Sequence, residues 1–193
     1  MSPFEFVFGL FGLLLGLCIA EIFGGIGRAF ERRSQIRLGW LSPLLAIVVL
    51  CDLTSYWASL WEDRNIIPMN AVTLMAGALF AGIYYLAAYV VFPDELQPGA
   101  DLDEQFFRVR RLVLGISCLA FFGVATVELA ITRELGLGYF LVNVAVFVPT
   151  YAATLLSRSK WMVAGGLAIL IAFNLVGAIT HTVHPFSARQ SQS

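Results

Sequence analysis

The sequence predicts an all-α membrane protein, a single bundle of six transmembrane helices with both termini on the non-cytoplasmic side. Apolar residues make up 59% of the 193 residues and charged residues only 13%, whereas a soluble domain has about 45–50% and about 25%. A membrane-spanning helix needs about 20 predominantly apolar residues. Six segments meet this criterion, at 4–28, 40–61, 69–92, 107–132, 138–156 and 161–182. They form one domain, residues 1–186, followed by a polar tail, residues 187–193, that we expect to be disordered.

The basic residues predict the orientation of the bundle. Nine of the twelve lysines and arginines lie in or beside the connections that follow the first, third and fifth segments. Cytoplasmic loops carry an excess of Lys and Arg, so we expect these connections in the cytoplasm and both termini outside it. A bacterial cytoplasmic (inner) membrane is the expected location, and the lipid bilayer is the first expected partner. The net charge of −1 predicts no attraction to nucleic acid.

The sequence carries no motif that predicts a cofactor or a reaction. All three cysteines lie inside apolar segments without paired spacing, which indicates buried thiols and neither a disulfide nor a zinc site. No dinucleotide fingerprint, phosphate loop, zinc-protease motif or nucleophile elbow occurs. We therefore expect no cofactor, and an enzyme is the less favoured class.

The first segment repeats a small residue every fourth position. This spacing produces a smooth strip along which the backbone of another helix can approach closely. Packing within the bundle is the favoured interpretation, and a dimer interface is the alternative. The strip consists of Gly12, Gly16, Ala20 and Gly24.

A carboxylate, Glu21, lies beside that strip and needs a partner. Arg28 lies two helical turns further along the same segment, and Arg110 and Arg111 stand at the start of the fourth segment. An intramembrane carboxylate pairs with a cation or reaches the interface. We expect an ion pair between Glu21 and one of these arginines.

The second segment places Asp52 about halfway across the membrane. Ser55 and Tyr56 continue a polar stripe from this residue toward the outer boundary, while the preceding half of the segment is apolar. A carboxylate at this depth is costly, and such residues serve as proton relays or cation ligands. The alternative is a carboxyl group that only holds helices together through hydrogen bonds.

Other segments place polar residues at a similar depth when their alternating directions are followed. Polar groups in hydrocarbon must face one another or water. We therefore predict a shared pocket open to the non-cytoplasmic side. Its candidate members are Asp52, Ser55, Tyr56, Glu128, Asn143, Asn174 and His181.

Two histidines one helical turn apart raise the question of a metal site. His181 and His184, with Glu128, would supply nitrogen and oxygen ligands of the kind that zinc and related metals accept. Paired histidines at this spacing are common without metal, so we predict none.

Three functions of different class fit the sequence. The first is a small transporter or channel-like protein that uses Asp52 for a proton, a small cation or a polar solute. The second is a non-catalytic accessory or scaffold subunit. The third is a membrane enzyme or metal or cofactor binder. The small size favours the scaffold, because one six-helix unit leaves little room for two gates unless it dimerises. A homodimer or a larger membrane complex is therefore among the partners considered.

Overall fold

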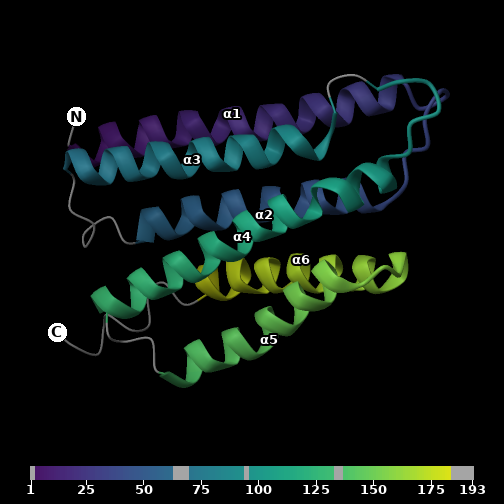
Figure 1. Ribbon diagram of the computed structural model, residues 1–193. Helices are drawn as coiled ribbons and strands as arrows, with labels where there is room; N and C mark the ends of the chain where they lie inside the picture. The colour runs from purple at the N-terminus through teal and green to yellow at the C-terminus, as the bar shows by residue number, and fades with distance from the viewer. Residues whose placement is uncertain (1–2, 63–69, 94–95, 133–136, 184–193) are drawn as a thin grey trace.

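Six helices make up the described part of the chain (Figure 1). The computed structural model describes residues 3–62, 70–93, 96–132 and 137–183. The all-helical prediction is therefore confirmed. The helices are α1 (Pro3–Glu31), α2 (Leu41–Glu62), α3 (Ala71–Val91), α4 (Leu102–Thr132), α5 (Leu137–Leu156) and α6 (Lys160–Val183).

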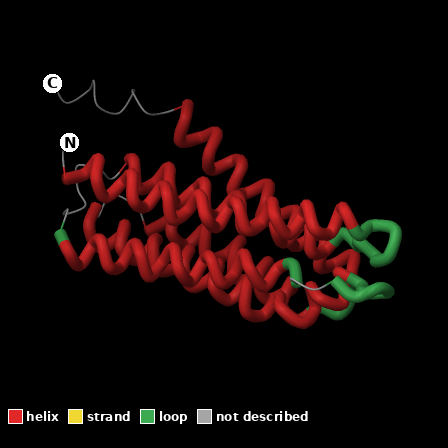
Figure 2. The backbone as a smooth tube through the Cα atoms, turned by 90° about the horizontal axis from the view of Figure 1, so that it is seen from above, coloured by secondary structure: helices red, strands yellow, loops and turns green. Residues whose placement is uncertain are grey.

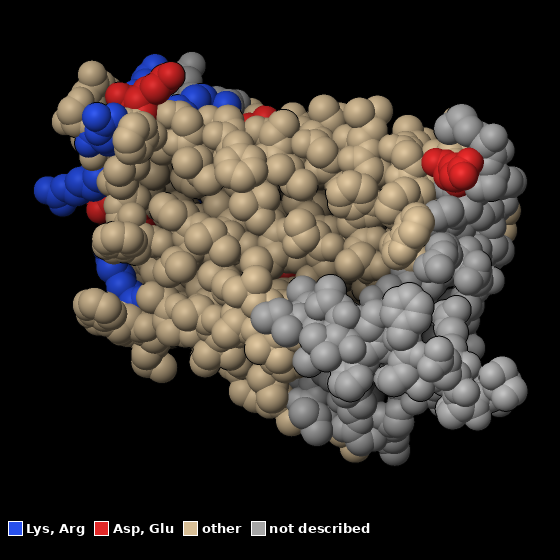
Figure 3. Space-filling view, turned by 180° about the vertical axis from the view of Figure 1, so that it is seen from behind, with Lys and Arg blue, Asp and Glu red and all other residues tan. Residues whose placement is uncertain are grey.

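Five of these helices, α1, α2, α3, α4 and α6, are long and apolar enough to cross a membrane. The described apolar stretch of α5 is shorter, Val144–Leu156. Large apolar side chains such as Leu79 and Leu119 are exposed, and Figure 3 shows a nearly uncharged surface between the two ends. Helices satisfy their own backbone hydrogen bonds, so such faces can contact lipid. These features are those of a membrane-spanning bundle.

The start of α4 differs from the prediction. The helix begins at Leu102, five residues before the predicted start at 107, because the Asp101 carboxylate accepts a hydrogen bond from the Asp103 backbone N–H at 2.8 Å. A side-chain oxygen in this position caps a helix and satisfies one of its free amides. The prediction counted apolar residues, and the first turn of α4 is polar.

α2 is the central helix of the bundle. α1, α3, α4 and α6 all pack against it, and Figure 1 shows α2 and α4 between the α1–α3 pair and the α5–α6 pair. Leu45, Val49 and Leu53 of α2 are completely buried. A polar side chain in the middle of α2 is therefore enclosed by other helices.

The small-residue strip of α1 lies mostly on the outside of the bundle, contrary to the packing face that we expected. Only Gly12 packs closely, since a side chain there would lie 3.3 Å from the Trp57 ring. Gly16, Ala20 and Gly24 are exposed. α1 is apolar all round, so residue size alone does not identify the packing face. The side chains that α1 buries are larger: Leu15, Cys18 and Ile22.

Three connections, residues 32–40, 92–101 and 157–159, meet at one end of the molecule, which we call the basic end. Figures 1 and 2 show these loops together, and Figure 3 shows Lys and Arg side chains gathered there. The first two loops are joined by backbone hydrogen bonds. The Arg37 N–H donates to the Ala100 carbonyl at 2.8 Å, and the Leu102 N–H donates to the Arg37 carbonyl at 3.0 Å.

Asp103, in the first turn of α4, connects α4 to α2 and to α6 at the basic end. Its Oδ1 accepts from the backbone N–H groups of Trp40 and Leu41 at 3.0 and 3.1 Å, so it caps the start of α2. Its Oδ2 accepts from Lys160 Nζ, at the start of α6, at 2.7 Å. Gly39 has φ +58°, and a side chain there would collide with the Asp103 carboxylate. The sequence Gly39-Trp40-Leu41 thus lets the carboxylate approach the amides that the helix start leaves free.

Replacing Asp103 by Ala is predicted to lower the free energy of unfolding by roughly 1–2 kcal/mol, the range for losing a helix N-cap. Asp103→Asn keeps an acceptor oxygen and should lose less. Glu104→Ala is the matched control. Glu104 and Arg108 are both exposed and their charged groups lie 3.8 Å apart, and an exposed ion pair of this kind contributes little to stability. Denaturant unfolding in lipid bicelles measures all three, and equal losses for Asp103→Ala and Glu104→Ala would contradict the cap.

Candidate functional site

Four helices place polar side chains around one point in the centre of the bundle. Asp52 of α2, Tyr84 of α3, Ser117 of α4 and Asn174 of α6 each lie within about three residues of the midpoint of their helix. We call these four residues, together with Ser55 of α2, the Asp52 cluster. Helices that span the same thickness bring their midpoints to one depth, so the cluster lies near the middle of the apolar layer.

The Asp52 carboxylate is buried, with 5% of the residue exposed. Asn174 Nδ2 donates to Asp52 Oδ1 at 3.3 Å, and the Tyr84 hydroxyl donates to Asp52 Oδ2 at 3.4 Å. Both distances exceed the usual range for hydrogen bonds, so both contacts are weak. The carboxylate thus receives one neutral donor on each oxygen.

Asn174 connects α6 to α2 through both ends of its amide. Its Nδ2 also donates to the Leu170 carbonyl at 3.1 Å, and its Oδ1 accepts from the Ser55 hydroxyl at 3.1 Å. Both the nitrogen and the oxygen of the Asn174 amide therefore have protein partners. Hydrogen bonds of this kind join neighbouring helices in membrane proteins.

Ser117 completes the cluster from the α4 side. Its hydroxyl faces the Asp52 carboxylate, and the residue is 1% exposed. No hydrogen bond of standard geometry connects this hydroxyl to any described residue. A buried hydroxyl without a partner is unusual, and each case requires an explanation.

No lysine, arginine or histidine among the described residues forms an ion pair with Asp52. The described ion pairs lie elsewhere, at Glu21–Arg28, Glu104–Arg108 and Asp103–Lys160. The hydrogen-bond donors around Asp52 are neutral, so a charged carboxylate here keeps its full negative charge.

Aromatic rings enclose one side of the cluster. The Tyr56 ring meets the Tyr84 and Phe80 rings edge-on, with centroids 5.6 and 5.1 Å apart. Such edge contacts between aromatic rings are favourable. The predicted pocket member Tyr56 therefore lies in the wall beside Tyr84.

The predicted pocket residues divide into two groups. The structure brings Asp52, Ser55 and Asn174 together and places Tyr56 beside them. The side chains of Glu128, Asn143 and His181 lie outside the described residues, as does His184. Within the described chain, no three His, Cys, Asp or Glu side chains group closely enough to hold a metal ion.

Tyr84 and Ser117 belong to the cluster although they were not among the predicted members. Both lie near the midpoints of their helices, which is the signal that could have identified them.

Glu21 pairs with the nearest of its three candidate partners. Arg28 Nη2 donates to Glu21 Oε1 at 3.0 Å. Arg110 instead donates through Nη1 to the carbonyls of Thr154 and Ser157, at 3.1 and 2.6 Å. Thr154 lies in the last turn of α5 and Ser157 directly follows the helix, a position where a cation is favourable. Arg111, one position further along α4, is exposed.

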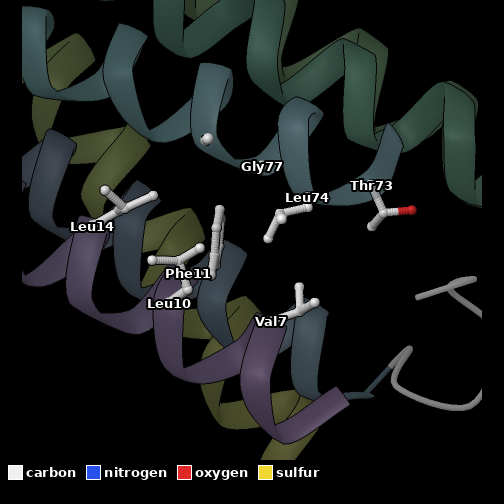
Figure 4. A pocket seen from close by; sticks show the side chains of 8 residues that line it. Val7, Leu10, Phe11, Leu14, Thr73, Leu74 and Gly77 are labelled. Carbon is white, nitrogen blue, oxygen red and sulfur yellow. The ribbon is translucent and has the colours of Figure 1, made fainter. Parts of the chain in front are cut away.

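A groove between α1 and α3 is apolar and distinct from the Asp52 cluster (Figure 4). Thr73 is the only hydroxyl-bearing residue in its lining, so it lacks the convergent polar groups of a binding site. The side chains labelled in Figure 4 are Val7, Leu10, Phe11, Leu14, Thr73 and Leu74, beside Gly77.

No protein-family model, curated protein or solved structure matches this chain.

Replacing Asn174 by Leu is predicted to lower the free energy of unfolding by about 0.6–1.7 kcal/mol, the range measured for hydrogen bonds between membrane helices. The substitution removes one donor to Asp52 and the acceptor of Ser55. Thr126→Val is the control, since the Thr126 hydroxyl is exposed and bonds only to the Phe122 carbonyl of its own helix. Unfolding of both variants in bicelles checks the prediction, and a neutral Asn174→Leu would contradict the cluster's role.

Proposed function

We propose that this integral membrane protein is a small transporter or channel-like protein in which Asp52 binds a proton or a small cation. The observation that carries the proposal is a buried carboxylate in the centre of the bundle, without a positively charged partner among the described residues. Carboxylates inside membranes are rare, and they mark ion pathways and proton relays.

The surroundings of Asp52 favour binding of a proton or a cation. An isolated carboxylate in an apolar medium is unstable unless it is neutralised or paired. Two long hydrogen bonds from neutral donors stabilise the charge only in part. Binding a proton or a cation removes the remaining penalty, and its release restores it.

The contacts at the basic end bear on the side from which ions reach Asp52. Backbone hydrogen bonds between loops and the Asp103 contacts hold the helices together at that end. We propose that ions reach Asp52 from the opposite end. With the basic end in the cytoplasm, as the charge bias indicates, that opening faces the non-cytoplasmic side of a bacterial inner membrane.

A second candidate function is a non-catalytic scaffold subunit, and the Asn174 amide favours it, because both its nitrogen and its oxygen have protein partners. In this case the Asp52 cluster only holds α2, α3 and α6 together. A partner subunit or a second copy of the chain would then bind the exposed helix faces. Ion flux distinguishes the two candidates, because the scaffold carries none.

Flux measurements on purified protein in liposomes test the role of Asp52. We expect proton or small-cation flux in the unmodified protein and a loss of about tenfold or more in Asp52→Asn, which keeps the shape and removes the charge. Asp101→Asn in the loop is the control and should retain flux. Flux that is absent, or equal in Asp52→Asn, would contradict the proposed mechanism and favour the scaffold.

Labelling of single cysteines tests the orientation. In a variant with Cys18, Cys51 and Cys118 replaced by Ala, a cysteine is introduced by Ser34→Cys at the basic end or by Ser191→Cys in the tail. A membrane-impermeant maleimide applied to intact bacterial cells should label the tail and leave position 34 unlabelled until the cells are permeabilised. The reverse pattern would place the basic end outside.

A further inference from the structure

The contacts of the Asp52 cluster accommodate the carboxyl group in either form. In the ionised form, Asp52 accepts from Asn174 and Tyr84, and Ser117 presents a third hydroxyl. In the protonated form, the lone pairs of the Tyr84 or Ser117 hydroxyl can accept the carboxyl proton. Ser55, the remaining member, donates to Asn174. The ionised form is the one that can bind a cation.

An ionised Asp52 leaves one negative charge uncompensated in the apolar layer. Two kinds of group could balance it, a basic side chain or a bound cation, and no basic side chain of the described residues does so. A single positive charge matches a single carboxylate. Divalent ions such as Ca²⁺ take six to eight oxygen ligands, commonly from several carboxylates, so a monovalent ion fits better.

The ligand atoms available in the cluster are all oxygens. The Asp52 carboxylate, the Ser117 hydroxyl and the Tyr84 hydroxyl have lone pairs, and no thiol or imidazole takes part in the contacts. Oxygen ligands suit hard cations, whereas thiolate and imidazole suit transition metals. Ser117 supplies an independent observation, because its buried hydroxyl faces Asp52 but makes no hydrogen bond of standard geometry with any described residue. A cation beside Asp52 would provide the missing partner for its oxygen.

We propose that the Asp52 cluster is a binding site for a monovalent metal cation, tested here as Na⁺, with Asp52, Ser117 and Tyr84 as ligands. The inference rests on the proposed function, since it names the ion that a transporter of this kind would carry. Asp52 neutralises the ion, and the two hydroxyl oxygens replace part of its hydration shell.

Binding of Na⁺ to the full chain in lipid nanodiscs tests the site. We expect saturable ²²Na⁺ binding and a thermal midpoint that rises with Na⁺ but not with choline at equal ionic strength. Ser117→Ala should weaken Na⁺ binding about tenfold, which corresponds to about 1.4 kcal/mol. Without Na⁺ this variant should be at least as stable as the unmodified protein, because it removes a buried hydroxyl that has no partner. Thr126→Ala, also on α4, is the matched control and should bind Na⁺ normally.

The outcomes separate this inference from the proposed function. If Na⁺ binding is saturable and is lost in Asp52→Asn, but the protein shows no flux, the cation site is supported and transport is overturned. Proton flux that is lost in Asp52→Asn but insensitive to Na⁺ and to Ser117→Ala would retain transport and overturn the cation site. Equal effects of Na⁺ and choline on the thermal midpoint, with no ²²Na⁺ binding, would also overturn the site.

Discussion

A charged group enclosed by apolar helices must find its stabilisation inside the protein, and this constraint governs the centre of the bundle. Asp52 lies on α2, the helix against which α1, α3, α4 and α6 pack. Its contacts therefore determine how several helices meet. Asn174 joins α6 to α2, and Tyr84 joins α3 to the same carboxylate. The hydrogen bonds that stabilise Asp52 are also bonds that hold the bundle together.

The polar contacts at the basic end are stronger than those in the centre of the bundle. At the basic end, Asp103 accepts from two amides and a lysine at 2.7 to 3.1 Å, and Arg110 donates to the carbonyls of Thr154 and Ser157 at the end of α5. In the centre, Asp52 accepts from neutral groups at 3.3 and 3.4 Å. Hydrogen bonds weaken as the distance between donor and acceptor increases. The helices are thus fixed at one end, and the central cluster holds them less firmly.

The fold was largely predictable because helix length and composition respond to membrane thickness. Depth along each helix was also readable, and it placed Asp52, Ser55 and Asn174 together correctly. The direction in which a side chain points was not readable, because an apolar helix can pack through any of its faces. Gly16 and Ala20 are exposed for this reason, while the unremarked Ser117 faces the cluster. Packing partners that are distant in the sequence decide these directions.

A structural role and an ion-binding role for Asp52 depend on the same contacts, so those contacts cannot by themselves distinguish the two. Asn174 is satisfied by protein groups in either case. Ser117 differs, because a purely structural cluster gains nothing from burying a hydroxyl without a partner. An alanine would fill most of that space without the penalty. The presence of a serine at this position, facing a carboxylate that has no ion-pair partner among the described residues, is what favours a ligand that needs both oxygens.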